Sequence, residues 1–124
     1  MGLIHTALVV SDIDATLDFY ADLGLEQTNE FELDGVRNVY VGSDDTDMEL
    51  QFKYDPTSAA RVEPAGIDHV AVEVADADRA FEDIVEAQSP EVVKPPVDID
   101  PANARAAFVK DPDGYVVELV ALED

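Results

Sequence analysis

The residues best suited to chemistry are the two histidines, His5 and His69, which are the only histidines in the 124-residue chain. They lie 64 positions apart, and each stands near the start of a β-like stretch that runs into an acidic helix start. The same offset of 64 superposes further pairs of identical residues: Ala7 and Ala71, Val10 and Val74, Asp12 and Asp76, Asp14 and Asp78. The sequence therefore contains an internal repeat with one histidine in each half.

A glutamate stands among apolar residues near the end of each half, in Met48-Glu49-Leu50 and in Val117-Glu118-Leu119. The two glutamates are 69 positions apart, which differs from the histidine offset by an amount that loop lengths can absorb. On a strand, side chains alternate between faces, so each carboxylate lies opposite its apolar neighbours. A carboxylate in such surroundings is costly to bury without a partner.

Two imidazoles and two carboxylates at corresponding positions form a plausible octahedral metal site. This donor set suits Zn²⁺, Ni²⁺, Co²⁺, Mn²⁺ or Fe²⁺ better than Ca²⁺ or Mg²⁺, and positions are left for water or substrate. Ala7 and Ala71, two residues after the histidines, leave space on the same face. The alternative is that each residue is an ordinary strand residue; the use of every available histidine favours the metal site.

The elements that must position these residues follow the same plan twice. In the first half we expect a strand over 3–10 and then a helix that Asp12 caps and that ends at Gly24. Two strands follow, over 25–33 and 36–42, joined by an Asp34-Gly35 turn, and a further strand covers 47–54. In the second half we expect a strand over 67–74, a helix that begins at Asp76 or Asp78, and an extended segment over 91–97. The last two strands, over 105–110 and 115–122, are joined by a tight turn at 111–114. Each half reads βαβββ, which predicts an α+β fold with a mostly antiparallel sheet. We expect a single domain over 1–124, with module 1 at about 1–56, a linker at about 57–65 and module 2 at about 66–124.

Charge limits the partners of this chain. It carries 29 acidic and 7 basic residues, a formal net charge of −22. Such a surface repels nucleic acid and anionic lipid, so neither is an expected partner. We interpret the evenly spread acidity as adaptation to a cytoplasm of molar salt, where screening shortens to about 3 Å. The absence of cysteine, of an 18-residue apolar stretch and of a signal peptide agrees with a cytoplasmic location.

The chain resembles the vicinal oxygen chelate superfamily, and within it glyoxalase I (lactoylglutathione lyase). The resemblance covers nearly the whole length and is most specific in three stretches: Ile4 to Val10 leading to Asp18-Phe19-Tyr20, Gly66 to Ala71, and Ala107 to Leu119 with its Lys110-Asp111-Pro112-Asp113-Gly114-Tyr115 core. It implies paired βαβββ modules in a cupped sheet of the glyoxalase/bleomycin-resistance type, with mixed or antiparallel strands. It also implies that one divalent metal is held by His5, Glu49, His69 and Glu118.

The implied reaction converts the hemithioacetal of a 2-oxoaldehyde, such as methylglyoxal, and a thiol to a 2-hydroxyacyl thioester. The metal stabilises the enediolate oxygens, and a glutamate moves the proton between adjacent carbons. We expect Glu118 in that role with Glu49 as fellow ligand; the symmetry of the two halves leaves Glu49 as the alternative base. The resemblance favours Ni²⁺ or Co²⁺, with Zn²⁺ or Mn²⁺ as alternatives, and a homodimer in which each subunit supplies one histidine–glutamate pair to a site.

Two departures from glyoxalase I concern the thiol. Val9 stands where the family usually has an arginine that helps to hold the glutathione carboxylate, and Lys53 replaces a frequent asparagine. These changes leave the identity of the thiol open. The few cations that could meet an anionic thiol carrier are Arg37, Lys53, Arg61 and Arg105. Two alternatives are an acyl-CoA epimerase on the same metal platform and a metal-free protein of this fold that sequesters a small molecule.

Overall fold

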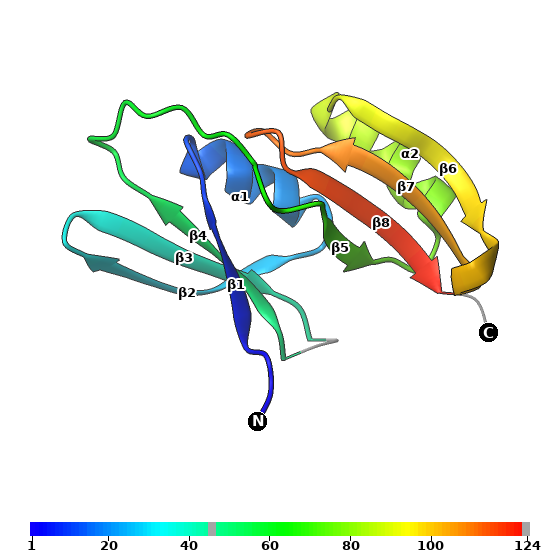
Figure 1. Cartoon of the computed structure of the whole chain (residues 1–124), viewed down its shortest axis with the longest axis horizontal. Helices are drawn as coiled ribbons and strands as arrows, with labels where there is room; N and C mark the ends of the chain where they lie inside the picture. The colour runs from blue at the N-terminus through cyan, green and yellow to red at the C-terminus, as the bar shows by residue number, and fades with distance from the viewer. Residues whose placement is uncertain (45–46, 123–124) are drawn as a thin grey trace. The chain divides into compact units, whose positions relative to one another are not determined.

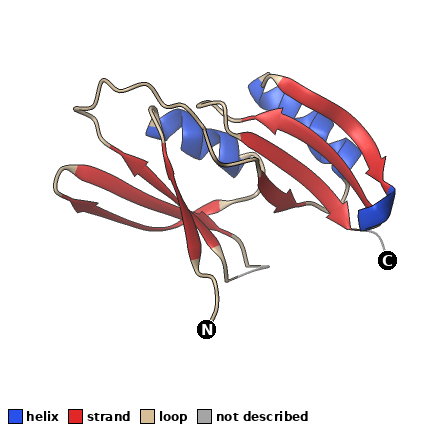
Figure 2. Ribbon diagram, in the orientation of Figure 1, coloured by secondary structure: helices blue, strands red, loops and turns tan. Residues whose placement is uncertain are grey.

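The computed structural model describes residues 1–44 and 47–122. It divides into two compact units, Met1–Glu63 and Pro64–Asp124. Each unit consists of one α-helix and one four-stranded mixed sheet, and the elements follow the order βαβββ (Figures 1 and 2). The predicted α+β class and the repeated βαβββ plan are thus confirmed.

The first unit is built from β1 (His5–Val9), α1 (Ile13–Ala21), β2 (Glu26–Leu33), β3 (Val36–Gly42) and β4 (Glu49–Tyr54). Its strands lie in the order β1-β4-β3-β2. β1 runs parallel to β4, whereas the other neighbouring strands are antiparallel. This order brings the first and last strands of the unit side by side at the place where His5 and Glu49 begin them.

The core of this unit lies between α1 and one face of the sheet. Tyr20 packs against Phe19 and Phe52, with ring centroids 5.2 Å and 5.0 Å away. The other buried apolar residues are Leu8, Val10, Ile13, Val39 and Val41. Alternation along the strands then directs His5, Glu49 and Tyr40 to the opposite face.

The second unit is built from β5 (Val70–Glu73), α2 (Ala77–Gln88), β6 (Val92–Ile99), a 3₁₀ turn (Asp100–Ala102), β7 (Ala104–Lys110) and β8 (Val116–Leu122). The strand order is β5-β8-β7-β6, with β5 parallel to β8. Val72, Ile84, Ala107, Val109, Val117 and Leu119 are among its buried apolar residues. The second unit therefore repeats the topology of the first.

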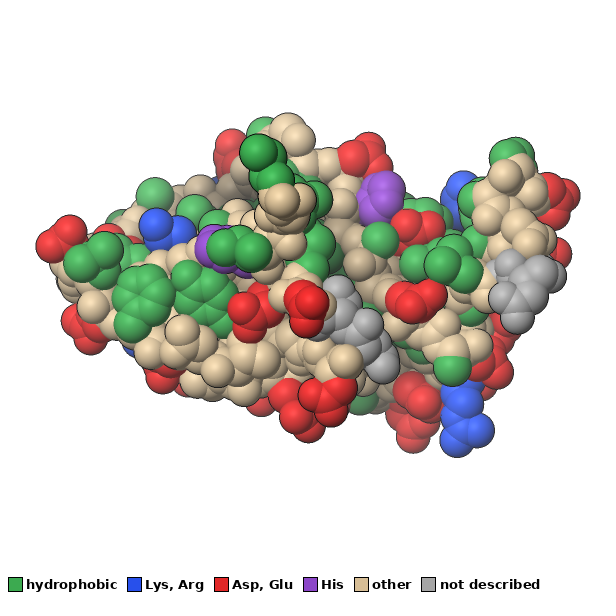
Figure 3. Space-filling model, turned by 90° about the horizontal axis from the view of Figure 1, so that it is seen from below, with side chains coloured by type: hydrophobic (Ala, Val, Ile, Leu, Met, Phe, Trp, Pro, Cys, Tyr) green, Lys and Arg blue, Asp and Glu red, His purple; other side chains and the backbone are tan. Residues whose placement is uncertain are grey.

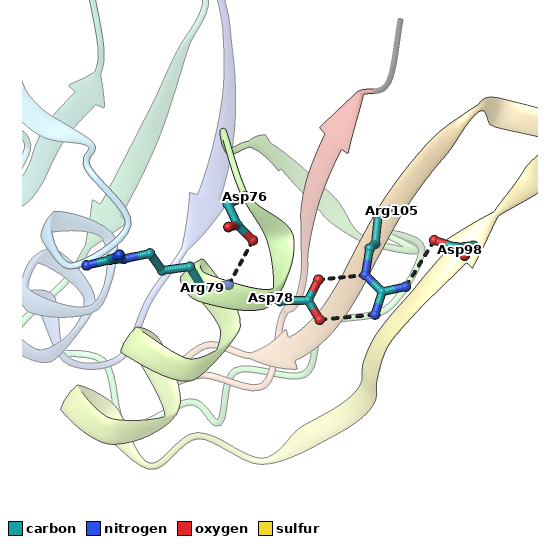
Figure 4. A network of polar contacts seen from close by, with 5 residues as sticks. All are labelled: Asp76, Asp78, Arg79, Asp98 and Arg105. Atoms are coloured by element: carbon teal, nitrogen blue, oxygen red, sulfur yellow. Dashed lines mark hydrogen bonds and ion pairs between the residues drawn. The ribbon is translucent and has the colours of Figure 1, made fainter.

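An ion-pair network joins the start of α2 to two strands (Figure 4). The Arg105 guanidinium donates to both carboxylate oxygens of Asp78, at 2.6 and 3.0 Å, and to Asp98 at 2.9 Å. Its bonds to Asp78 hold the pKa of that carboxyl below its usual value. Next to it, the carboxylate of Asp76 accepts from the Arg79 backbone N–H at 3.1 Å and caps the helix. Arg105 thus has a structural role on the helix side of its sheet.

Short-range signals placed helix starts and turns correctly. Asp12 caps α1 by accepting from the Ala15 N–H at 3.1 Å. Asp34 and Gly35 both have positive φ, 53° and 81°, as a hairpin of the predicted type requires. In the second unit the buried Asp111 carboxylate accepts from the backbone N–H groups of Asp113 (2.9 Å) and Tyr115 (3.0 Å).

Several of the expected strands start earlier in the sequence than the observed ones. β1 begins at His5 rather than residue 3, β4 at Glu49 rather than 47, and β5 at Val70 rather than 67. Leu3 and Ile4 are exposed, at 82% and 69%. A β-like sequence forms a strand only where a partner strand lies beside it. The connection between the strands expected over 36–42 and 47–54 lies partly outside the described residues. Within those residues, no helix is both long and apolar enough to span a membrane.

Candidate functional site

The first unit brings His5 and Glu49 together. They are direct partners in the parallel pairing of β1 with β4, and the Glu49 N–H donates to the Ile4 carbonyl at 2.9 Å. The His5 ring meets Tyr40 edge to face, with centroids 5.3 Å apart. The Glu49 carboxylate accepts a hydrogen bond from the Thr28 hydroxyl. This unit therefore presents an imidazole and a carboxylate side by side on the face of the sheet turned away from α1.

The second unit brings His69 and Glu118 together. His69 Nε2 lies 3.1 Å from Glu118 Oε1, and the side chains are 35% and 17% exposed. On its other side, His69 Nδ1 lies 2.6 Å from Asp68 Oδ2. The His69 ring also meets Phe108 edge to face at 5.8 Å. His69 itself immediately precedes β5, so its place depends on these side-chain contacts and not on strand pairing.

The two pairs differ in register. His5 stands opposite Glu49, whereas Glu118 stands opposite Ala71, two residues beyond His69. The residue opposite Ala7, the counterpart of Ala71, is Gln51. The expectation that the glutamates occupy equivalent positions was therefore off by two residues. A shift of two keeps the side chain on the same face, so both glutamates still face the histidine of their own unit.

The contacts of His69 fit a metal ligand. An ionised carboxylate can only accept a hydrogen bond, so the approach of Nδ1 to Asp68 requires a proton between the two atoms. The approach of Nε2 to a Glu118 oxygen at 3.1 Å likewise requires a proton or a cation between them. Ligands at right angles around a metal, with bonds of about 2.1 Å, lie about 3 Å apart. An outer carboxylate that holds the second ring nitrogen is also usual for metal-bound histidine.

Each unit supplies two of the four predicted ligands. Among the described residues, no group of three or more histidine, cysteine, aspartate or glutamate side chains is placed to hold a metal ion. The structure thus places His5 with Glu49 and His69 with Glu118, and the shared four-ligand site stays a prediction.

Two of the cations considered as partners for an anionic thiol carrier already form ion pairs with carboxylates of this chain. Arg37 forms an ion pair with Glu30, which raises the pKa of the guanidinium, and Arg105 is held by Asp78 and Asp98. Lys53 is exposed on β4, four residues after Glu49 and hence on the same face. Arg61 is exposed in the segment that follows β4.

Acidic side chains are spread over the face shown in Figure 3, with few basic ones among them. This distribution agrees with the absence of a localised acidic tail in the sequence. Because the chain has only 7 basic residues, the exposed position of Lys53 on the Glu49 face of β4 is informative.

Five residues that lie beside the predicted ligands were not anticipated from the sequence: Thr28, Tyr40, Gly42, Asp68 and Phe108. Asp68 had a visible signal, because it adjoins His69 in the chain. The other four had none, because they lie beside a predicted ligand only through the arrangement of segments 7 or more residues apart in sequence.

The chain belongs to the Glyoxalase/Bleomycin resistance protein/Dioxygenase superfamily, whose profile matches residues 2–119. A lactoylglutathione lyase of Neisseria meningitidis is 33% identical over 127 residues, covering 97% of this chain and 90% of the relative. A probable lactoylglutathione lyase of Vibrio parahaemolyticus is 30% identical, covering 95% of this chain and 88% of the relative.

Solved structures support the same fold. A member of this superfamily from Sphaerobacter thermophilus matches with a TM-score of 0.78 at 27% identity, covering 98% of this chain and 97% of its own. Glyoxalase I from Zea mays matches with a TM-score of 0.84 at 22% identity, and this chain spans 45% of the maize chain. The expected glyoxalase/bleomycin-resistance-like fold is confirmed.

Proposed function

We propose that this chain is a metal-dependent lyase of the glyoxalase I type. Its relatives named lactoylglutathione lyase, at 27–33% identity, support a glyoxalase-like enzyme. The observation that carries the proposal is the meeting of one histidine with one glutamate in each unit, seen most directly in the 3.1 Å approach of His69 Nε2 to Glu118 Oε1. The proposed substrate is the hemithioacetal of a 2-oxoaldehyde such as methylglyoxal.

In the proposed site, His5, Glu49, His69 and Glu118 hold one divalent metal, with Ni²⁺ or Co²⁺ favoured and Zn²⁺ or Mn²⁺ as alternatives. When bound, the metal would act as a Lewis acid that stabilises negative charge on the two vicinal oxygens of the substrate. Asp68 would keep the Nε2 lone pair of His69 available by holding the proton on Nδ1. Because the family site often lies between two subunits, we also propose a homodimer.

Glu118 is the proposed base. Its carboxylate accepts the proton from the carbon that carries the hydroxyl and the thiol sulfur, and returns it to the adjacent carbonyl carbon. The hydroxyl oxygen loses its proton and becomes the thioester carbonyl, while the former ketone oxygen gains one and becomes the 2-hydroxyl. Atoms and electrons therefore balance within the substrate. Glu49 is less suited to this role, because the Thr28 hydroxyl already occupies its Oε2.

The chain offers Lys53 as the cation for a carboxylate or phosphate on the thiol. It is exposed on the face of β4 that carries Glu49, whereas Arg37 and Arg105 are paired with carboxylates. With Val9 at the position of the family arginine, we propose a thiol whose anionic group reaches Lys53. Glutathione, coenzyme A and smaller thiols form the panel that tests this point.

The test is thioester formation by metal-loaded protein in high salt, with Ni²⁺, Co²⁺, Zn²⁺ or Mn²⁺ and the panel of thiols. Glu118→Gln should retain metal and lose at least about 100-fold in kcat, since general-base catalysis contributes at least that much. Glu86→Gln, an exposed residue of α2, is the matched control and should keep full activity. Stoichiometric metal without turnover for any metal and thiol would refute the lyase assignment.

The acyl-CoA epimerase alternative shares proton abstraction next to a carbonyl. It predicts exchange of the α-proton of an acyl-CoA with solvent deuterium, and no thioester formation from hemithioacetals. A metal-free binding protein predicts that purified protein holds no metal and that His5→Ala leaves ligand binding unchanged.

A further inference from the structure

Glu49 is held by a residue from a strand that is not its neighbour. In the first unit the strands follow the order β1-β4-β3-β2, so β3 separates Glu49 on β4 from Thr28 on β2. Adjacent strands lie about 4.8 Å apart, so these two backbones are separated by about 10 Å. The Thr28 hydroxyl nevertheless donates to Glu49 Oε2. Such a contact across an intervening strand requires a special arrangement of both strands.

The first part of this arrangement is a β-bulge in β2. Gln27 pairs with Val41 and Asn29 pairs with Tyr40, so Thr28 is the extra residue between two consecutive positions of β3. A bulge breaks the alternation of side chains and redirects the extra one. Here it directs Thr28 over β3 toward Glu49.

The second part is a glycine at the end of β3. A Cβ atom at Gly42 would lie 3.3 Å from Glu49 Cγ, 3.6 Å from Thr28 Cγ2 and 3.9 Å from Glu49 Oε2. Any side chain at this position would enter the space in which Thr28 and Glu49 meet. The φ of Gly42 is not positive, so the backbone does not require glycine here. The reason for glycine is therefore the space above it.

From this geometry we infer that Thr28 is a positioning residue for Glu49, and that Gly42 provides the gap through which it acts. The hydroxyl occupies Oε2 of Glu49 and orients the carboxylate beside His5, so that Oε1 is left for a cation. This inference rests on the proposed metal centre. It adds a role for two residues outside the four predicted ligands, and it makes the two glutamates unequal.

The inequality is visible in the contacts of the two carboxylates. Glu49 is fixed from the side by a neutral hydroxyl donor, whereas the described contact of Glu118 is with His69. A ligand with an outer hydrogen bond is pre-oriented, and loss of such a partner typically weakens metal affinity by about 10- to 100-fold. The expected effect of Thr28 is therefore on metal affinity, through the orientation of Glu49.

The test compares Co²⁺ affinity and the visible Co²⁺ spectrum of the full-length chain in four variants. Thr28→Val removes the hydroxyl but keeps the shape, and should weaken Co²⁺ binding by about tenfold or more and change the spectrum. Thr28→Ser keeps the hydroxyl and should restore most of the affinity. Gly42→Val should lose at least as much as Thr28→Val. Thr57→Val is the matched control: its hydroxyl also donates to a carboxylate, Asp55 at 2.8 Å, but on an exposed segment outside the site.

A double-mutant cycle separates positioning from a general structural effect. In the Glu49→Gln background, Thr28→Val should cause little further loss of Co²⁺ affinity, because its action passes through that carboxylate. Equal Co²⁺ affinity of wild type and Thr28→Val, or an undiminished effect in the Glu49→Gln background, would overturn the inference. If wild type binds Co²⁺ but forms no thioester, the proposed reaction fails while the affinity comparison still decides the role of Thr28. If wild type binds no Co²⁺, the metal centre and this inference fail together.

Discussion

A buried hydroxyl in α1 provides a quantitative test of the packing. Thr16 is 0% exposed, and its Oγ1 has no hydrogen-bond partner among the described residues. It lies on the core side of the helix with Ile13 and Tyr20, at helical spacing. Replacement by valine keeps the branched shape and puts a methyl group where the unpaired hydroxyl was. We expect Thr16→Val to stabilise the protein.

The magnitude follows from the burial. An unpaired buried polar group costs about 1–3 kcal/mol, and helix propensities of threonine and valine are similar. We expect the free energy of unfolding to rise by about 1–2 kcal/mol. This is the lower part of that range, because the surrounding packing does not adjust fully to the new methyl group and part of the gain is lost. At about 2.1 cal/mol/K per residue, the 124 residues convert this gain to a rise in Tm of about 4–8 °C.

The assay is urea unfolding followed by circular dichroism, with a thermal scan as a second measure. Thr6→Val, on an exposed position of β1, is the matched control and should change stability by less than about 0.5 kcal/mol. Thr16→Ser should destabilise, since it keeps the hydroxyl and loses a buried methyl group. A Thr16→Val protein no more stable than wild type would refute the reasoning and would mean that the hydroxyl donates to a carbonyl of the preceding turn.

Two further predictions concern charge. Arg105 holds the pKa of Asp78 below the ordinary aspartate value of about 3.9, so the ionised form is favoured in the folded state. The contact therefore stabilises the folded protein at pH values above this ordinary pKa. The stabilisation is lost as the pH falls through the lowered pKa of the folded state. Asp78→Asn and Arg105→Gln should both be less stable than wild type at pH 7 by urea unfolding, and the Asp78→Asn difference should shrink at acidic pH; a difference independent of pH would contradict this. With a net charge of −22, Tm should rise as KCl increases from 0.1 M to 1 M, because the screening length falls from about 10 to about 3 Å. A Tm that falls or stays flat would argue against the interpretation of the acidity as adaptation to high salt.

The sequence by itself determined the features that depend on neighbouring residues. Asp12 and Asp76 cap the two helices because an aspartate side chain can reach the N–H groups three residues on. Asp34-Gly35 turns the first hairpin because both residues tolerate positive φ. The spacing of 64 between the histidines revealed the duplication, and with it the βαβββ plan of each unit.

Strand length and register were decided by the tertiary structure. Residues 67–69 belong to the strand expected from the sequence, yet β5 begins at Val70, where the pairing with Val117 begins. The shift of two residues between the glutamates has the same origin, since it depends on how β1 and β5 align with strands more than 40 residues away. Alternation along one strand identifies the face of a side chain but not the residue that lies opposite it.

The partners of the candidate ligands depend on the same long-range pairing. Arg37 and Arg105 could serve a ligand on sequence grounds, but each has carboxylates brought beside it by folding. The contact of Thr28 with Glu49 needs a bulge in β2, a glycine in β3 and the order of three strands. Residue types and their spacing thus identified two histidines and two glutamates as candidates. The residues that contact these four side chains were decided only by the pairing of distant strands. That pairing is stabilised by contacts between segments that are remote in the chain, which a local sequence pattern does not reveal.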